Sequence, residues 1–450
     1  MIPYRATGQT AWSKEKKESM KHRFAMNALI AAIVVILTVI PAVGRANATV
    51  RSNANTDHFT LTFWMCCTID TTAAPYPQAL ALFKKQYPNA KVNFVQKGRP
   101  EQELSAMQAA MMAHSEPDLY LQQIGNGDEG QFIKDGRQLN LDKYVKKYGW
   151  AKIYPTSLLK AQRRIWHGVY GVPHTNYWMG LWYKKDVLQK YHLPVPTTYA
   201  QLLKDCAVLK KNGIVPFLEA GYAPAILDRL IDAILEMVSP PSFRNSLLAG
   251  KAKFNSPYML KAFSMFKNDF VDKNYFQPGY LSAQEPQVYQ IFLKGKGGFW
   301  FSGNWEWGNW TTSKVDVRQF NMIPFPTGKN RIDAFQQGFF INKSTKYPDA
   351  AAALLNDIES PPAQRAEGKV NAALARLNTI DTKAMTPDEI RSIKIRDTRP
   401  TYTLLNEFGL DSPMTDQLYT VTTAVSTGQM TPQQAVNQLD RAAKQYHWYR

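Results

Sequence analysis

The fold is decided by residues 58–96, which read HFTLTFWMCCTIDTTAAPYPQALALFKKQYPNAKVNFVQ. Apolar and polar side chains alternate along residues 58–64, which is the pattern of a half-buried strand. Apolar side chains between residues 79 and 87 then recur at helical spacing, and a Pro-Asn pair ends that helix. Residues 91–96 give a second strand, so the chain opens with a strand, a helix and another strand.

The alternation continues beyond this opening. A second helix face follows at Leu104, Met107 and Met111, and a short strand at 119–122 completes a β-α-β-α-β order. Such an order implies a parallel or mostly parallel sheet. A second series begins near Gly168, with its strands and helices predicted at 181–183, 199–211, 215–218, 224–238, 256–272, 298–302, 320–325, 335–342 and 348–360. Residues 320–325 are predicted to cross between two lobes.

The chain is long enough to need two hydrophobic cores, because a single core rarely organises 450 residues. We find no internal repeat, low-complexity run or long flexible linker in it. Two lobes joined by several crossing segments, without a linker, would form a cleft with a hinge. The sequence therefore predicts an α/β protein of two lobes.

The first 48 residues have the composition of an export signal. A basic stretch from Lys14 to Arg23 precedes an uncharged, largely apolar run that ends at Gly44, and Ala46-Asn47-Ala48 fits a signal-peptidase site. The alternative is an uncleaved N-terminal anchor, since the uncharged run approaches the ~20 residues that span a bilayer. Either interpretation places the remaining chain outside the cytoplasm.

The net charge of the whole chain is +18, of which the first 48 residues contribute seven basic and two acidic side chains. Basic chains can bind nucleic acid. Here Lys and Arg are scattered without an arginine-rich tract, so no nucleic-acid partner is expected. Attraction to an acidic cell envelope and an acidic sugar ligand both remain open as explanations.

The cysteines do not form a disulfide framework or a zinc motif. Cys66 and Cys67 are adjacent and Cys206 lies in a predicted helix. We expect free, mostly buried thiols. Neither a cofactor nor a metal is predicted, because the chain has no nucleophile-elbow, P-loop or metal-ligand motif.

Four stretches, in this order and spacing, resemble the extracellular solute-binding proteins of ABC importers, family 1, and specifically the maltodextrin-binding type. They are LTFW at 61–64 followed by FKKQYP at 83–88; PD at 117–118; YGVP at 170–173 followed by LWYKKD at 181–186 and PTTY at 196–199; and GKG at 295–297 followed by FSGNWEW at 301–307 and TSKV at 312–315. The tail GQMTPQQA at 428–435 is also similar to the closing helix of the family.

This resemblance implies a two-lobed, periplasmic-binding-protein-like (type II) α/β fold with a ligand cleft between the lobes. We expect residues 49–167 and 327–378 in lobe 1, and residues 168–326 and 379–450 in lobe 2. The implied function is non-enzymatic: a monomer that binds a sugar or oligosaccharide and delivers it to the permease subunits of an ABC transporter, which would supply the ATP hydrolysis.

A sugar offers apolar C–H faces surrounded by hydroxyl groups, so its binder needs aromatic platforms and polar partners. The resemblance places Trp305 where the family stacks a tryptophan on the sugar, while Trp300 and Trp307 are expected to pack in the core. The predicted ligand-binding residues are Trp305, Glu306, Asn176, Tyr177, Trp178, Tyr222, Asp70 and Asp128.

Two departures from the family pattern make maltodextrin itself doubtful as the ligand. Tyr177 stands where maltodextrin binders carry an acidic sugar contact. Met414 and Thr415 stand where a late stacking aromatic is expected. A smaller or differently shaped sugar is therefore predicted.

Other functions are less consistent with the sequence. GNGDEG at 125–130 matches G-x-G-x-x-G, but Asp128 and Glu129 would repel a pyrophosphate and no acidic residue follows at the required strand end. A secreted glycoside hydrolase would need two carboxylates across a cleft, and nothing in the sequence links Glu306 with Asp128. A sensor ectodomain of the same fold stays open as an alternative.

Overall fold

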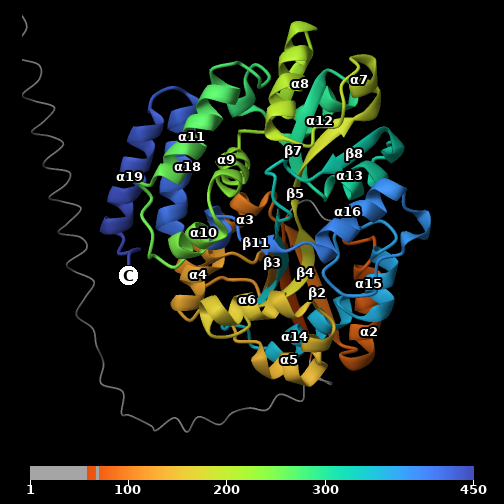
Figure 1. Cartoon of the computed structure of the whole chain (residues 1–450). Helices are drawn as coiled ribbons and strands as arrows, with labels where there is room; N and C mark the ends of the chain where they lie inside the picture. Colours follow the sequence, from red (N-terminus) through yellow and green to blue (C-terminus); the bar gives the residue numbers. More distant parts are fainter. Residues whose placement is uncertain (1–57, 67–69) are drawn as a thin grey trace, which may run out of the picture. The chain divides into compact units, whose positions relative to one another are not determined.

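The computed structural model describes residues 58–66 and 70–450, and Figure 1 shows their arrangement. The predicted export signal, residues 1–48, lies outside the described residues. Within the described part of the chain, no helix has both the length and the apolar character needed to cross a membrane.

Lobe 1 is the part of the chain built on a five-stranded sheet of order β2-β1-β3-β10-β4. Strand β1 is parallel to both β2 and β3, as the opening sequence predicts, whereas β10 runs antiparallel to β3 and β4. The strands of this sheet are β1 (Phe59–Met65), β2 (Ala90–Gln96), β3 (Leu119–Gln123), β4 (Gly171–Tyr177) and β10 (Phe335–Ile341).

The helices of lobe 1 bury apolar faces against this sheet. Phe83 of α2 is 1% exposed and lies in the same core as Phe63 of β1 and Leu354 of α14. These helices are α2 (Tyr76–Gln86), α3 (Pro100–Met112), α4 (Asn126–Lys134), α5 (Asp142–Tyr148), η1 (Trp150–Lys152), α6 (Thr156–Trp166), α14 (Pro348–Ile358) and α15 (Pro361–Glu367).

Lobe 2 is built on a four-stranded sheet of order β6-β7-β5-β8. Strands β6 and β7 are parallel, and β5 runs antiparallel to β7 and β8. The prediction that residues 320–325 cross between lobes is wrong, because β8 pairs along β5 inside this sheet. The strands are β5 (Met179–Lys184), β6 (Val215–Leu218), β7 (Gly297–Gly303) and β8 (Phe320–Ile323).

Helices pack on both sides of the lobe 2 sheet and form a large core in which Leu181, Phe299 and Leu439 are fully buried. A second core beside it gathers tryptophans that include Trp182, Trp300 and Trp310. The helices are α7 (Lys185–Lys190), α8 (Tyr199–Lys211), α9 (Pro224–Val238), α10 (Pro241–Leu248), α11 (Pro257–Phe266), η2 (Lys267–Val271), η3 (Tyr280–Ser282), α12 (Glu285–Leu293), α13 (Glu306–Thr312), η4 (Val317–Gln319), α18 (Ser412–Ser426) and α19 (Pro432–Gln445).

Three segments join the two sheets. The first is Trp178, between β4 and β5. The second runs from β8 to β10 through β9 (Ile332–Asp333). The third lies after α15 and contains η5 (Thr382–Ala384), α16 (Pro387–Thr398), β11 (Thr401–Tyr402) and α17 (Asn406–Gly409). Strands β9 and β11 pair in parallel, and the backbone N–H of Met179 donates to Asp333 at 2.7 Å.

The chain passes from the lobe 1 sheet to the lobe 2 sheet at Trp178, whereas the sequence predicts that lobe 2 begins at residue 168. The difference arises because β4, which the sequence leaves unassigned, pairs with β10 at the edge of the lobe 1 sheet. The other predicted lobe limits stay predictions. Because the crossing segments hydrogen-bond to one another, the loops at the strand ends are held in fixed positions around the junction.

Candidate functional site

The turn after β7 is held by two tryptophans, Trp182 of β5 and Trp178 of the first crossing segment. The indole N–H of Trp182 donates to the carbonyl of Gly303 at 3.1 Å. Trp178 donates its backbone N–H to the Asn304 side chain at 3.2 Å, and its carbonyl accepts the Asn304 N–H at 3.1 Å. The backbone that presents Trp305 is therefore fixed before any ligand arrives.

The Trp305 ring lies on this turn and is partly exposed. A Cβ atom added to Gly303 would lie 1.8 Å from the ring carbon Cζ3, so only glycine fits beneath the indole. Tyr177 meets the ring edge to face at 5.4 Å between centroids, and Phe335 does the same at 6.1 Å. These contacts fix the ring while leaving part of it accessible, which is the geometry of an aromatic platform.

Glu306 was predicted to contact the ligand, but its carboxyl is turned into the protein and the residue is 2% exposed. One oxygen, Oε1, accepts the indole N–H of Trp305 at 3.0 Å and the Ser302 hydroxyl at 2.9 Å. The other oxygen accepts the amide of Asn309 at 3.1 Å. Burial, with a smaller contribution from Glu285, raises the pKa of Glu306 to about 8.

The aromatic contacts continue from Trp305 into the junction between the lobes. Phe335 stacks obliquely on Phe408 of α17 at 4.6 Å. The guanidinium of Arg229 lies 4.9 Å from the Phe335 ring and 2.6 Å from the carboxylate of Glu407. Phe408 and Met414 are both buried in the lobe 2 core, so neither side chain offers a stacking face, and the departure from the family pattern at Met414 stands.

Asp128 lies half-buried in the first turn of α4, at the carboxyl end of β3. The glycines around it have a packing role. A Cβ on Gly125 would lie 2.2 Å from the carbonyl of Glu407, and one on Gly127 would lie 2.8 Å from the Glu407 Cα. The G-x-G-x-x-G spacing thus allows α4 to approach the α17 backbone, with no phosphate needed to explain it.

Tyr222 lies in the loop that follows β6, where its backbone N–H donates to the carbonyl of Ala283 at 3.1 Å. Its side chain is 51% exposed, which is unusual for an aromatic residue of this protein. Strands β6 and β7 are parallel, so their carboxyl ends lie at one edge of the sheet. The Tyr222 loop and Trp305 leave the sheet at that edge, where open α/β sheets bind ligands.

Asp70 lies in the loop that follows β1 and is exposed. Its carboxylate accepts both the backbone N–H and the hydroxyl of Thr72, at 2.8 and 2.6 Å. These bonds lower the pKa of Asp70. They shape the turn before α2.

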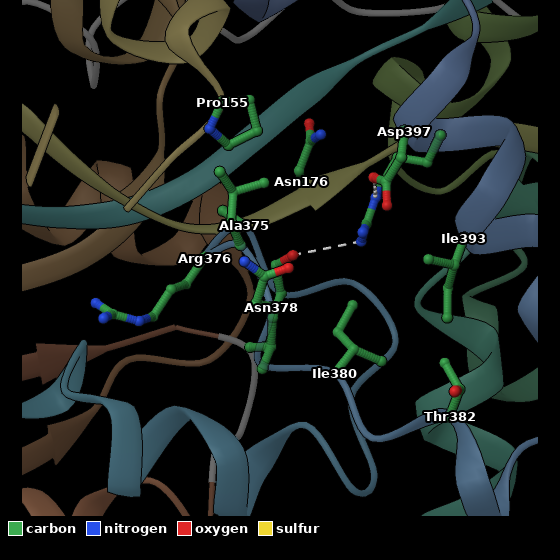
Figure 2. A pocket seen from close by; sticks show the side chains of 12 residues that line it. Pro155, Asn176, Ala375, Arg376, Asn378, Ile380, Thr382, Ile393 and Asp397 are labelled. Atoms are coloured by element: carbon green, nitrogen blue, oxygen red, sulfur yellow. Dashed lines mark hydrogen bonds and ion pairs between the residues drawn. The ribbon is translucent and has the colours of Figure 1, made fainter. Parts of the chain in front are cut away.

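Asn176 and Trp178 do not join Trp305, although Tyr177 between them does. Asn176 is 9% exposed and lines a cavity of about 220 Å³ behind the junction, together with residues of the third crossing segment and α16. Figure 2 shows Asn176 across this cavity from Ile393 and Asp397. Trp178 is 0% exposed, inside the tryptophan core. Its backbone, rather than its ring, serves the site.

The structure thus brings together Tyr177, Trp305 and Glu306. It also adds residues that sequence reasoning missed: Phe335, Phe408 and Arg229 at the junction. Phe335 is the first residue of β10, the strand that returns to lobe 1. This position in the predicted strand 335–342 is the one sequence signal that could have suggested Phe335 as a site residue. Nothing in the sequence pairs Arg229 with Glu407, which lie far apart along the chain.

The chain matches known proteins in sequence and in fold. A probable sugar-binding periplasmic protein of Rhizobium meliloti is 24% identical over 324 residues, covering 70% of this chain and 77% of its own length. A probable sugar-binding periplasmic protein of Brucella suis is 24% identical over 391 residues, covering 83% and 90%. By their names, these relatives are binding proteins.

Solved structures share the fold over almost their whole length. A protein from a study of xylan utilization by Caldanaerobius polysaccharolyticus superposes with a TM-score of 0.76 at 19% identity, covering 85% of this chain and 99% of its own. A chitin oligosaccharide binding protein superposes with a TM-score of 0.73 at 17% identity, and the match covers 84% of this chain and 98% of that protein. The sequence model of the bacterial extracellular solute-binding proteins matches residues 69–365, which is more than half of the chain. The chain therefore belongs to the family of bacterial extracellular solute-binding proteins.

Proposed function

We propose that this protein captures a sugar or oligosaccharide between its lobes, outside the cytoplasmic membrane, and delivers it to the permease of an ABC importer. The observation that carries the proposal is the Trp305 platform. Its ring lies over Gly303, is held at its edges by Tyr177 and Phe335, and keeps an exposed part. A flat aromatic surface that is fixed in advance binds the C–H face of a sugar ring at little entropic cost.

Polar side chains suited to sugar hydroxyls follow strands of both lobes. Asp128 and Asp70 follow parallel strands of lobe 1, and Tyr222 follows a strand of lobe 2. Carboxylates and a phenol accept or donate hydrogen bonds to hydroxyl groups. Tyr177, Trp305, Tyr222, Asp70 and Asp128 are the residues we propose to touch the ligand, while Glu306 and Trp178 support the site. Asn176 lines the separate cavity beside the third crossing segment.

The relatives favour a sugar over other solutes. Besides the two periplasmic proteins, a melibiose/raffinose/stachyose-binding protein of Bacillus subtilis is 25% identical over 207 residues. We propose that this chain is likewise a binder without catalytic activity, acts as a monomer and takes no nucleic acid. Residues 1–48 would export it, as a cleaved signal or as an anchor.

Transport would use two arrangements of the lobes. A ligand shifts the equilibrium toward the closed arrangement only through its preference for that form. The closed arrangement would then dock on the permease. The permease would thus distinguish the sugar-bound protein from the empty one by the relative position of the two lobes.

A thermal-shift screen of residues 49–450 tests the proposal. The panel holds neutral and acidic mono- and oligosaccharides, with polyamines as non-sugar solutes. A ligand at 100 times its Kd stabilises the protein by about 2.7 kcal/mol, which raises the melting temperature measurably. A sugar that raises it, and that is recovered unchanged by chromatography, supports the proposal. Stabilisation by polyamines alone, or a sugar that is hydrolysed, would contradict it.

A further inference from the structure

The Trp305 platform depends on one hydrogen bond between a partly buried indole and a buried carboxyl. An indole N–H is a donor only, and a buried donor without an acceptor costs free energy. In this structure the acceptor is Oε1 of Glu306, at 3.0 Å. Turning the indole over about its side-chain bond would move the N–H away from this oxygen, so the hydrogen bond selects one ring orientation.

Glu306 is itself held in place by two further donors. The Ser302 hydroxyl bonds to Oε1 at 2.9 Å, and the Asn309 amide bonds to Oε2 at 3.1 Å. Ser302 belongs to β7 and Asn309 to the next turn of α13, so the carboxyl is fixed from both sides of the Trp305 turn. With the residue 2% exposed and both oxygens engaged, a ligand has no access to this carboxyl.

The space around the indole makes its orientation matter. The six-membered ring lies above Gly303, where no side chain fits, and the Tyr177 ring meets the indole at an interplanar angle of 84°. A reoriented indole would present a different outline to the ligand and would lose these contacts. Glu306 therefore acts at the surface that faces the ligand without reaching it.

We propose that Glu306 is a positioning residue, which sets the affinity for the ligand by fixing the orientation of the Trp305 indole. The effect on affinity rests on the proposed function, because it is measured with a bound sugar. This assignment replaces the direct sugar contact expected for Glu306 from the sequence.

The proposal predicts that Gln can replace Glu306 and that Leu cannot. The amide of Gln keeps an oxygen for the indole N–H and the Ser302 hydroxyl, and its NH₂ group can donate to the Asn309 side-chain oxygen after that amide turns over. Leu offers no acceptor to any of the three donors.

The experiment is a double-mutant cycle read by ligand affinity and by melting temperature. The variants are Glu306→Gln, Glu306→Leu, Trp305→Phe and the Glu306→Leu/Trp305→Phe double variant, with the sugar identified by the thermal-shift panel as the probe. We expect Glu306→Leu to weaken binding about tenfold and Glu306→Gln by no more than about threefold. In the Trp305→Phe protein, which has no indole N–H, Glu306→Leu should have little further effect on the Kd.

Two results would overturn the assignment. One is equal weakening by Gln and by Leu; the other is a Glu306→Leu effect of the same size in the Trp305→Phe protein, since the carboxyl would then act independently of the indole. If Glu306→Leu fails to fold, the proposal is tested by the exchange rate of the Trp305 indole proton with solvent, measured in the Glu306→Gln variant and in the wild type. The exchange should be as slow in Glu306→Gln as in the wild type, and fast exchange in the Gln variant would refute the proposal. The indole proton is measured without ligand, so failure of the sugar hypothesis would be recognised separately.

Discussion

The guanidinium of Arg99, at the start of α3 in lobe 1, lies 3.1 Å from the carboxylate of Glu285, at the start of α12 in lobe 2. Both side chains are about 30% exposed or less. Glu285 also raises the pKa of two buried acids of lobe 2, Glu306 and Glu219, in each case after burial itself. The positive charge of lobe 1 thus meets a negative region of lobe 2, and we expect this contact between the lobes to favour the closed arrangement.

Breaking this ion pair should weaken ligand binding without touching the Trp305 platform. Partly exposed pairs contribute up to about 1 kcal/mol, so Arg99→Gln should raise the Kd by about two- to fivefold. The loss should shrink as salt is added, because screening weakens the pair in the wild type. Titration calorimetry at low and high salt measures both effects.

The matched control for Arg99→Gln is Arg318→Gln, which breaks a pair with Asp316 inside one loop of lobe 2. It should leave the Kd and its salt dependence as in the wild type. Equal behaviour of the two variants would show that the Arg99–Glu285 pair does not contribute to closure.

A single methyl group at Gly303 should damage the ligand site. The Cβ of Gly303→Ala would lie 1.8 Å from Cζ3 of Trp305, so the ring must move from its position. We expect the Kd to rise about tenfold or more, as for other changes that displace a central aromatic contact. Gly308→Ala serves as the control, because its Cβ meets its nearest neighbour, the Val370 carbonyl oxygen, at 3.5 Å. A wild-type Kd for Gly303→Ala would mean that the ligand does not use the Trp305 ring.

The free energy of unfolding should fall as the pH rises from about 5.5 to about 8.5. Burial raises the pKa of Glu129 to about 8, and the pKa of Asp333 to about 7. A carboxyl whose pKa is raised by folding stabilises the protein fully below its unfolded pKa, and this contribution is lost as the pH passes the folded pKa. Glu129→Gln should therefore make the pH-dependent fall in the free energy of unfolding smaller by roughly 2 kcal/mol or more.

Urea denaturation across this pH range measures the effect, with exposed Asp135→Asn as a control that should keep the wild-type slope. The Gln side chain can still accept the hydrogen bond that Tyr120 donates to Glu129. A slope in Glu129→Gln as steep as in the wild type would exclude Glu129 as a source of the pH dependence.

His174 should be needed for the stability of lobe 1. It lies 2.8 Å from Glu359 and 3.3 Å from Glu367, and all three side chains are almost fully buried. Burial alone would lower its pKa, but the two carboxylates outweigh burial and raise it to about 10. His174→Leu leaves both acids without their shared cation and should cost about 3 kcal/mol. Exposed His58→Leu should cost far less, and equal losses on urea denaturation at neutral pH would contradict this account.

Much of the fold could be predicted because local patterns agree with the tertiary contacts. Residues 199–211, 215–218 and 224–238 form elements with the predicted limits, since their apolar spacing, turn residues and burial all coincide. Cys206 is a free, buried thiol as expected. Cys66 is buried and its sulfur accepts the Gln337 amide at 2.9 Å, while Cys67 lies outside the described residues. β4 was missed because its edge pairing with β10 comes from residues more than a hundred positions away.

The candidate site was less predictable than the fold. Trp305 could be placed by its motif, and the structure gives it the setting of a platform. Its neighbour Phe335 begins β10, and Phe408, which packs on Phe335, comes from the third crossing segment. No local pattern reveals such contacts. Asn176, Tyr177 and Trp178 were grouped by position, but successive side chains of a strand point to opposite faces, so only Tyr177 reaches Trp305.

The central claim is that the Trp305 ring binds a sugar, and titration calorimetry of Trp305→Ala with the sugar found by the panel tests it most directly. We expect a loss of about 2 kcal/mol or more of binding free energy, which corresponds to at least about a 30-fold rise in Kd. The variant should keep its fold by circular dichroism. A Kd equal to that of the wild-type protein would contradict the claim.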